Sequence, residues 1–293
     1  MKKGIVSVVT ASVFYGMLPI ITKWILLEGV NSTSTVFYRM FASMLVSFVI
    51  LKLTGASLKA SGRQIFQMAL FGILGFGLCS ALLTVAYDFI PVGLASMLLF
   101  AYPLYVNIIM VVLFKEKLTG RMILSCALSL AGLILLCDFS TLSATGIICA
   151  ILSGVAYGVY IISNKKGNFV ELHGVLKIFY VTMTASVFFG ARAVLSGQFM
   201  LPSSPRAVLF ILCLALFATV LPQYLLSYGI TVLGASTASV LNMLEPVMNV
   251  ILGWVFFREV ISPLGRIGCV LIIMSGIIIA MDTGRNTDKE EVL

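Results

Sequence analysis

Long stretches of apolar residues alternate along the chain with short breaks of polar and turn-forming residues. The clearest breaks, at 28–29, 115–117 and 202–205, contain glutamate, glycine, lysine or proline. Because about 20 mostly apolar residues are enough for a helix to cross a bilayer, the pattern predicts transmembrane helices. The ten predicted spans are 4–27, 33–53, 64–86, 91–114, 120–137, 145–164, 174–196, 206–228, 233–257 and 263–282. The weak break at 229–232 leaves nine spans as the alternative count.

The composition agrees with this pattern. Hydrophobic residues make up 60% of the chain and charged residues 10%, whereas soluble domains carry about 25% charged residues. A soluble enzyme, a nucleic-acid binder and a disordered chain are therefore excluded, and we expect an all-α integral membrane protein. The last residues, 284–293, are polar and are predicted to form a disordered cytoplasmic tail.

The distribution of Lys and Arg predicts the orientation. With the N-terminus inside, thirteen of these residues fall on the internal side and four on the external side. Positive charge accumulates in cytoplasmic loops, so we expect a multi-pass protein of the plasma membrane with both termini in the cytoplasm. The net charge of +8 then reflects topology, and no nucleic-acid partner is expected.

Metal and cofactor sites are not expected. The six cysteines lie in or at the ends of apolar stretches, no two of them form a CxxC pair, and His173 is the single histidine. Zinc sites need several such ligands at short spacing. We interpret the cysteines as small buried apolar residues.

An internal repeat divides the chain into two halves. An offset of 142 aligns Tyr15-Gly16 with Tyr157-Gly158, and an offset of 143 aligns 95–120 with 238–263. Each half, 1–142 and 143–283, then holds five spans. Because five is odd, the second half would be inverted in the membrane, which is the architecture of many secondary transporters.

The same stretches carry a family resemblance. ASMLLFAYPLYVNIIMVVLFKEKLTG at 95–120 and ASVLNMLEPVMNVILGWVFFREVISP at 238–263 resemble the EamA-type members of the drug/metabolite transporter superfamily. The resemblance implies a central cavity formed by spans 1, 3, 4, 6, 8 and 9, and export across a prokaryotic plasma membrane. It leaves the substrate open, because the family handles amino acids, sugars, nucleotides, vitamins and drugs. Glu245-Pro246 aligns with Tyr102-Pro103, so any role of this carboxylate is confined to one half.

Two ionisable residues within the spans are the first candidates for a site, because charge at membrane depth is costly and usually faces a cavity or a partner. Glu245 precedes Pro246, which frees a backbone carbonyl near Asn242. Together with Asn242 or Asn249, the Glu245 carboxylate could bind a cation or exchange a proton. Alternatively, Glu245 could only pair with a basic side chain from another helix. Arg39 could hold a substrate carboxylate, or it could extend toward lipid headgroups.

Aromatic and amide side chains complete the predicted cavity. They are Tyr15, Tyr102, Asn107, Tyr157, Gln223 and Tyr224. An aromatic pocket with few charges suits an amphipathic or zwitterionic solute. Together with Arg39, Asn242, Glu245 and Asn249, these residues are the predicted substrate-binding set.

The predicted function is a secondary transporter of small organic metabolites such as amino acids, working by alternating access as a monomer or homodimer. Proton coupling through Glu245, facilitated diffusion and exchange all remain open. No Walker motif for ATP binding occurs. The alternatives are a membrane-embedded enzyme, for which paired catalytic groups are missing, and a receptor or channel-like protein.

Overall fold

A computed structural model describes residues 1–117, 119–136, 142–258 and 262–290, and every regular element in these ranges is a helix. Nine helical segments are long and apolar enough to cross a membrane within the described ranges. They are Lys2–Leu27, Ser32–Leu53, Gly62–Tyr87, Leu94–Phe114, Ala144–Lys166, Gly174–Leu195, Pro205–Leu233, Ala235–Phe257 and Pro263–Asp282. Each overlaps one predicted span, so the prediction of an all-helical membrane protein is confirmed.

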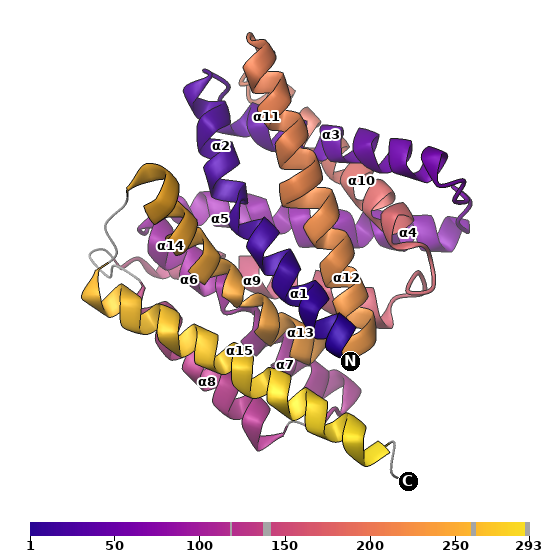
Figure 1. Cartoon of the computed structure of the whole chain (residues 1–293). Coiled ribbons are helices and arrows are strands. Elements are labelled where there is room, and N and C mark those ends of the chain that lie inside the picture. The colour runs from indigo at the N-terminus through magenta and orange to yellow at the C-terminus, as the bar shows by residue number, and fades with distance from the viewer. Residues whose placement is uncertain (118, 137–141, 259–261, 291–293) are drawn as a thin grey trace.

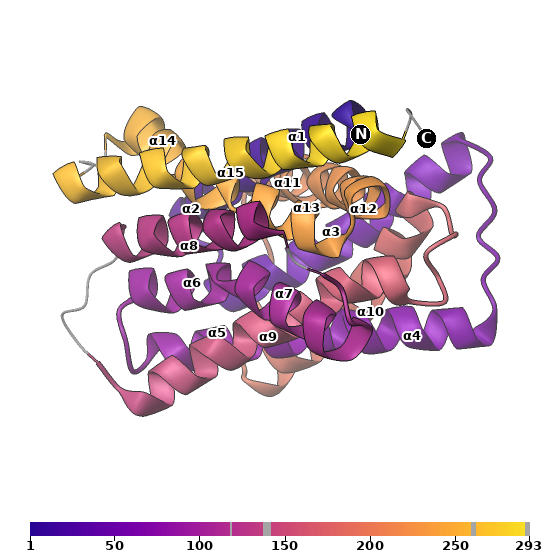
Figure 2. The ribbon, with the colours of Figure 1, turned by 90° about the horizontal axis from the view of Figure 1, so that it is seen from below.

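The fifth predicted span forms a shorter helix. α8, Gly120–Leu135, has 16 residues, fewer than the 20 or so that cross a bilayer upright; Cys137, the last residue predicted for this span, lies outside the described residues. α8 packs lengthwise against the last helix, α15, Pro263–Glu290, and the two lie side by side in Figures 1 and 2. The short helix therefore belongs to the bundle.

Proline residues break three of the spans. α1, Lys2–Gly16, gives way to α2, Leu18–Leu27; α6, Val92–Phe100, to α7, Tyr102–Phe114; and α13, Ala235–Asn242, to α14, Leu244–Phe257. Pro19, Pro103 and Pro246 each follow a break by one to three residues. Since proline lacks an N–H and its ring collides with the preceding turn, the helix is interrupted on the N-terminal side of each.

Two other spans contain a π-helical turn. η1, Ile73–Leu78, separates α4, Gly62–Gly72, from α5, Cys79–Tyr87. η2, Leu216–Val220, likewise separates α11, Pro205–Ala215, from α12, Leu221–Leu233. The remaining spans run without a break, as α3, Ser32–Leu53, α9, Ala144–Lys166, and α10, Gly174–Leu195.

Several local backbone features recur at the spacing of the sequence repeat. η2 begins 143 residues after η1, and the break at Met243 lies 142 residues after the break at Ala101. Lys115 and Arg258 end α7 and α14 with the same left-handed backbone, φ 55° in each. A positive φ is uncommon outside glycine, so its recurrence at two aligned positions is a specific likeness between the halves.

Polar residues in the sequence breaks begin the helices. Asn31 accepts a hydrogen bond from the N–H of Ser34 at 2.8 Å and caps α3. Ser61 and Gln64 form a reciprocal capping box at the start of α4. These side chains satisfy backbone N–H groups that a helix start leaves free.

Helices of the two halves pack against one another. α3 packs on α10 and α8 on α15, while α1 packs on α12 and α9 on α5. At the crossing of α8 and α15, a Cβ placed on Gly268 would lie 2.5 Å from the carbonyl oxygen of Gly132. The close approach therefore depends on small residues, as is typical of helix contacts in membranes.

The small residues spaced four apart on α9 have the same role. Ala150 is fully buried. A Cβ on Gly146 would meet Ile90 at 2.8 Å, and one on Gly154 would meet the carbonyl oxygen of Leu98 at 3.0 Å. These small residues form a close-contact face on this helix.

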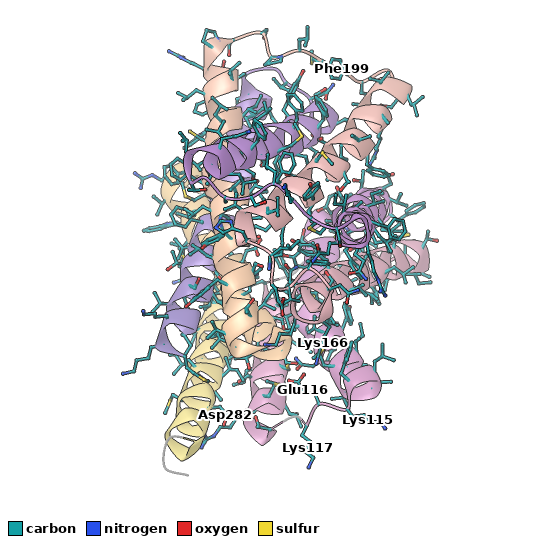
Figure 3. The ribbon with its side chains drawn as sticks, turned by 90° about the vertical axis from the view of Figure 1, so that its right-hand side faces the viewer. Lys115, Glu116, Lys117, Lys166, Phe199 and Asp282 are labelled. Atoms are coloured by element: carbon teal, nitrogen blue, oxygen red, sulfur yellow. The ribbon has the colours of Figure 1, made fainter. Side chains whose placement is uncertain are left out.

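Several lysines lie together at one end of the bundle. Lys115, Lys117 and Lys166 lie at one end, here called the basic end, whereas Phe199 lies at the other (Figure 3). α1 begins at the basic end and α15 ends there (Figure 1). α15 continues to Glu290, into the segment 284–293 that the sequence predicts to be a disordered tail. No proline or glycine after Gly284 interrupts its hydrogen-bond ladder; residues 291–293 lie outside the described part.

Candidate functional site

A cavity of about 410 Å³ lies between the halves of the chain. Side chains from α1, α2, α3, α5, α6, α7, α9 and α14, and Gly75 of η1, line it. It contains six of the ten residues that the sequence singles out, namely Tyr15, Arg39, Tyr102, Tyr157, Glu245 and Asn249. The lining extends to the exposed Tyr87 at the end of α5, away from the basic end.

Arg39 brings a positive charge to the cavity from α3. Its Nε donates a hydrogen bond to Oγ1 of Thr219 at 2.9 Å. Thr219 lies in η2 and donates in turn to the carbonyl oxygen of Leu214 at 3.0 Å. Within the described part of the chain no hydrogen bond is recorded for the two terminal guanidinium nitrogens. Arg39 is thus held at one nitrogen and retains donors for a ligand.

Glu245 brings a negative charge to the same cavity from the first turn of α14. Its Oε2 accepts a hydrogen bond from Nδ2 of Asn242 at 3.2 Å. Among the residues that the structure describes, neither a second hydrogen bond of this carboxylate nor an ion pair with Arg39 is recorded. Two opposite charges therefore share one cavity without neutralising each other by direct contact.

Tyrosine rings form the wall beside these charges. The ring of Tyr102 meets that of Tyr157 edge to face, with centroids 4.8 Å apart. The Tyr102 hydroxyl accepts from Asn242 Nδ2 at 3.0 Å and donates to the carbonyl oxygen of Ser239 at 3.4 Å. Tyr15 is 6% exposed. Aromatic faces can pack on an apolar or cationic part of a solute.

Asn249 adds a free polar atom. It lies one helical turn after Glu245 and lines the same cavity. Its Oδ1 is buried and has no hydrogen-bond partner among the described residues. An unpaired buried acceptor costs about 1–3 kcal/mol, so a hydrogen-bond donor on a bound solute would be stabilised here.

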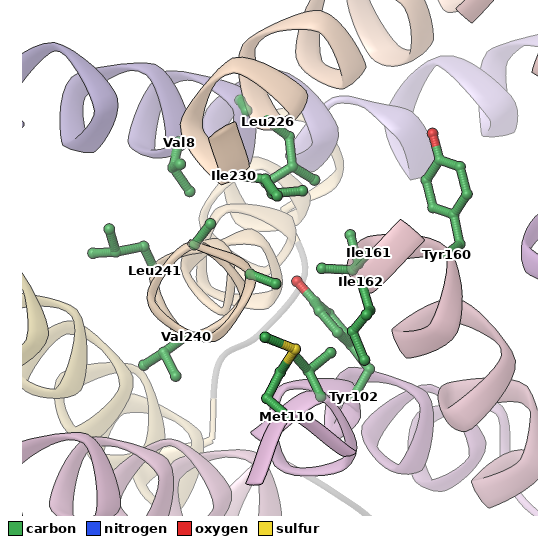
Figure 4. Close-up of a cluster of buried hydrophobic side chains, with 14 of the residues drawn as sticks. Val8, Tyr102, Met110, Tyr160, Ile161, Ile162, Leu226, Ile230, Val240 and Leu241 are labelled. Atoms are coloured by element: carbon green, nitrogen blue, oxygen red, sulfur yellow. The ribbon is translucent and has the colours of Figure 1, made fainter. Parts of the chain in front are cut away.

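Apolar side chains close the cavity toward the basic end. Figure 4 shows Val8, Met110, Ile161, Ile230 and neighbouring residues converging from several helices. Each of these four is at most 3% exposed. Val8, Met110 and Ile161 lie nearer the basic end than Tyr15, Tyr102 and Tyr157 of the cavity do on the same helices, and Ile230 joins them from α12, so apolar side chains separate the cavity from this end.

Neutral polar groups accompany this seal. Gln223 Nε2 donates to the hydroxyl of Tyr160. Ser227 Oγ donates to Oδ1 of Asn164 at 3.2 Å, and Asn164 Nδ2 donates to the carbonyl oxygen of Tyr160 at 3.0 Å. Gln223 therefore takes part in a hydrogen-bonded contact between α9 and α12, where it does not line the cavity.

Three other predicted residues also lie outside the cavity lining. Asn242 is directly behind it, bonded to Glu245 and Tyr102. Asn107 faces α8, where its Nδ2 donates to the carbonyl oxygen of Pro103 at 2.8 Å and lies 3.4 Å from Sγ of Cys126. Tyr224 is 38% exposed and its ring lies against His173. Position along an apolar span does not reveal which face of the helix is inward, and this explains the misplacement of Asn107 and Tyr224.

The cavity also contains residues that sequence reasoning missed. Ser80 of α5 and Ser96 of α6 line it, as do Pro19 and Phe100. α3 enters the lining through Arg39, whereas span 8, expected from the resemblance, contributes only Thr219 behind it. Single serines inside apolar runs carry no sequence signal, because most such serines bond to their own helix, as Ser153 does to the carbonyl oxygen of Ala150.

The described residues contain no group of three His, Cys, Asp or Glu side chains close enough to hold a metal ion. Five cysteines are free thiols, Cys79 and Cys126 among the buried ones; Cys137 lies outside the described residues. The chemistry that the cavity offers is thus recognition by two charges, amide groups and aromatic rings.

Comparison with known proteins gives relatives of similar length. The chain is 26% identical over 254 residues to the uncharacterized transporter YdfC of Bacillus subtilis, covering 84% of this chain and 80% of the relative. It is 25% identical over 280 residues to an uncharacterized transporter of Archaeoglobus fulgidus, covering 96% and 97% of the two chains. A third such transporter, from Clostridium kluyveri, is 24% identical over 309 residues, covering 100% of this chain and 97% of the relative.

The fold is also similar to a solved structure. A chain titled only as the crystal structure of a protein superposes with a TM-score of 0.82 at 17% identity, covering 97% of this chain and 99% of the other. A profile of the EamA-like transporter family matches the sequence twice, at residues 2–137 and 144–281. The chain therefore belongs to the EamA-like transporter family and is a multi-pass membrane transporter.

Proposed function

We propose that this transporter moves small zwitterionic or amphipathic organic solutes, such as amino acids, as a secondary transporter. The observation that supports this substrate class is the cavity in which Arg39 and Glu245 both present unused hydrogen-bonding atoms. A solute with a carboxylate and an ammonium group could bridge them, and its apolar part would contact Tyr15, Tyr102 or Tyr157. The cavity of about 410 Å³ is large enough for such a molecule.

Alternating access is the proposed mechanism. Residues 1–142 and 143–283 would form two inverted repeats of five helices each, with α8 as the fifth membrane helix. Three kinds of likeness support this: the π turns, the aligned left-handed caps, and helix pairings that are preserved when the halves are exchanged. Rocking of the halves about the cavity would open the basic end and close the other.

The basic end is proposed to face the cytoplasm, and the transporter is proposed to lie in the plasma membrane and to export its solute. The relatives from bacteria and an archaeon support the location. The Lys and Arg bias of the loops supports the orientation. The direction of transport rests on the family resemblance.

Solute counterflow in proteoliposomes tests the proposed substrate class. We expect purified protein to exchange radiolabelled amino acids from a defined mixture, and Arg39→Gln to lower exchange about 10- to 100-fold, the effect of losing about 1.5–3 kcal/mol of charged hydrogen bonding. Tyr224→Phe, a conservative change outside the cavity, serves as the control and should exchange at the normal rate. Equal exchange by wild type and Arg39→Gln would exclude a carboxylate-binding role.

Proton coupling through Glu245 is proposed as the source of energy. The carboxyl group faces the cavity, has one amide donor and could accept a proton from either side as the bundle rocks. We expect Glu245→Gln to abolish uptake driven by an imposed pH gradient while equilibrium exchange continues. Gradient-driven uptake by this variant at the normal rate would refute the coupling role.

A further inference from the structure

A second hollow lies at the basic end, apart from the central cavity. It has a volume of about 300 Å³ and lies among α4, α7 and α9. Apolar side chains form most of its lining, with Phe71 from α4, Ile109 from α7, and Val159 and Ile162 from α9. We call this hollow the basic-end groove.

Positive charge borders the groove. Lys166, the last residue of α9, lines it and is exposed; its Nζ lies 5.0 Å from the ring centroid of Phe114. Lys115 and Lys117 follow Phe114, the last residue of α7, and Figure 3 labels them at the same end of the bundle as Lys166. Glu116 lies between them in sequence, so these four side chains leave a net charge of +2.

Apolar lining and bordering cations together select one kind of occupant. An apolar groove on the outside of a membrane bundle is filled by hydrocarbon, because water there would have no polar partners. Lysines at the level of the headgroups attract anionic lipid, by about 1 kcal/mol for each charge near the surface. A zwitterionic lipid carries no net charge, so the lysines would not attract it in this way.

We propose that the basic-end groove binds an anionic phospholipid, with one acyl chain against Phe71, Ile109 and Val159 and the phosphodiester on Lys166. Lys115 and Lys117 add longer-range attraction. A bound lipid would fasten the ends of α4, α7 and α9 together. The site is independent of the solute cavity, since none of its lining residues borders that cavity.

Lipid binding to purified protein in detergent tests this site. The probes are palmitoyl-oleoyl phosphatidylglycerol, phosphatidylcholine with the same chains, and glycerol 3-phosphate as a headgroup without chains. Native mass spectrometry gives the apparent affinity of each. We expect phosphatidylglycerol to bind wild type more tightly than phosphatidylcholine does, and Lys166→Gln to weaken it about fivefold, equivalent to about 1 kcal/mol.

Two further variants distinguish lipid binding in the groove from general attraction of anionic lipid to positive charge. Lys52→Gln is the matched control, because Lys52 Nζ also lies over an aromatic ring, 5.6 Å from the ring centroid of Phe48, but Lys52 is not among the residues that line the groove. It should bind phosphatidylglycerol as wild type does. Val159→Trp fills the groove and should weaken binding while all three lysines remain.

Each contrary outcome overturns the proposal. Equal losses in Lys166→Gln and Lys52→Gln would mean diffuse charge attraction, and unchanged binding by Val159→Trp would mean that no chain enters the groove. Binding of glycerol 3-phosphate as tightly as the lipid would identify a free-phosphate site instead. A monodisperse size-exclusion profile shows that each variant is folded before its binding is compared.

Discussion

Asn242 connects three parts of the molecule through one neutral side chain. Its Nδ2 donates to Glu245 and to Tyr102, and its Oδ1 accepts from Ser12 Oγ at 3.2 Å. The side chain is 1% exposed. It is the last residue of α13 and lies three residues before Glu245, so the helix break and the polar contact share one location. The amide thereby positions Glu245 without adding charge.

Replacing this amide tests how much the contacts contribute. We expect Asn242→Leu to lower the free energy of unfolding by about 1–2 kcal/mol, because hydrogen bonds between membrane helices average about 0.6 kcal/mol and several partners lose theirs. Ser12→Ala should cost less, because the single hydroxyl hydrogen of Ser12 is shared between the carbonyl oxygen of Val8 and Asn242 Oδ1, so this change removes fewer hydrogen bonds than the loss of the amide does. Denaturation in mixed micelles measures both; a larger loss for Ser12→Ala would contradict this assignment.

At the residue scale, sequence reasoning identified charge but not orientation. Arg39 and Glu245 could be predicted because a charge within an apolar span needs a cavity or a partner. Asn107 is likewise a polar residue within an apolar span, but its side chain faces α8 and not the cavity. A polar side chain can be satisfied by its own helix or by a neighbour, and one sequence does not distinguish these outcomes.

Among the helices, the breaks at prolines were predictable and the π turns were not. Pro19, Pro103 and Pro246 indicate their helix breaks, because proline lacks a backbone N–H and its ring collides with the preceding turn. η1 contains apolar and small residues that are common in regular helices, so its sequence does not indicate its position. η2 ends two residues before Pro222, but the proline does not indicate which kind of helix interruption precedes it. The predicted boundaries agree with the helices to within a few residues, apart from the continuation of α15.

Two glycines on α15 provide a test of close helix packing. A Cβ on Gly268 would lie 2.5 Å from the Gly132 carbonyl oxygen, whereas one on Gly276 would lie 3.6 Å from Leu244, an ordinary contact. We expect Gly268→Ala to destabilise the protein by about 1–3 kcal/mol through overpacking and Gly276→Ala to be neutral or stabilising. Both changes gain the same helix propensity, so thermal stability in detergent isolates the contact. Equal stabilities would show that the α8–α15 crossing is not close-packed.

At the scale of the whole molecule, the sequence predicted where helices lie along the chain better than how they pack against one another. An apolar helix face can contact either lipid or another helix. The periodicity of the sequence therefore did not indicate that α3 packs on α10 or α1 on α12. The internal repeat was detectable because aligned motifs recur, and the recurring local backbone features agree with it. The position of span 2 in the cavity wall likewise follows from how the helices pack, which the sequence pattern does not reveal.

The proposed orientation can be measured in intact cells. In a protein without its native cysteines, we introduce one cysteine in place of Lys117 at the basic end or of Leu201, which is 72% exposed, in the segment next to Phe199. A membrane-impermeant maleimide should label Leu201→Cys from outside and Lys117→Cys only after the cells are permeabilised. The reverse pattern would place the basic end outside.

The seal at the basic end has a consequence for the forces that could act on it. The polar contacts beside the seal, including that of Lys165 Nζ with the carbonyl oxygen of Thr231, join α9 to α12 within the second half, whereas the side chains that the two halves bring together here, Val8 and Met110 with Ile161 and Ile230, are apolar. Separating such groups moves no fixed charge through the membrane field, and added salt has little to screen. Opening of this end should therefore be nearly independent of ionic strength and membrane voltage. Any voltage dependence of turnover would come from the solute, from Arg39 or from Glu245.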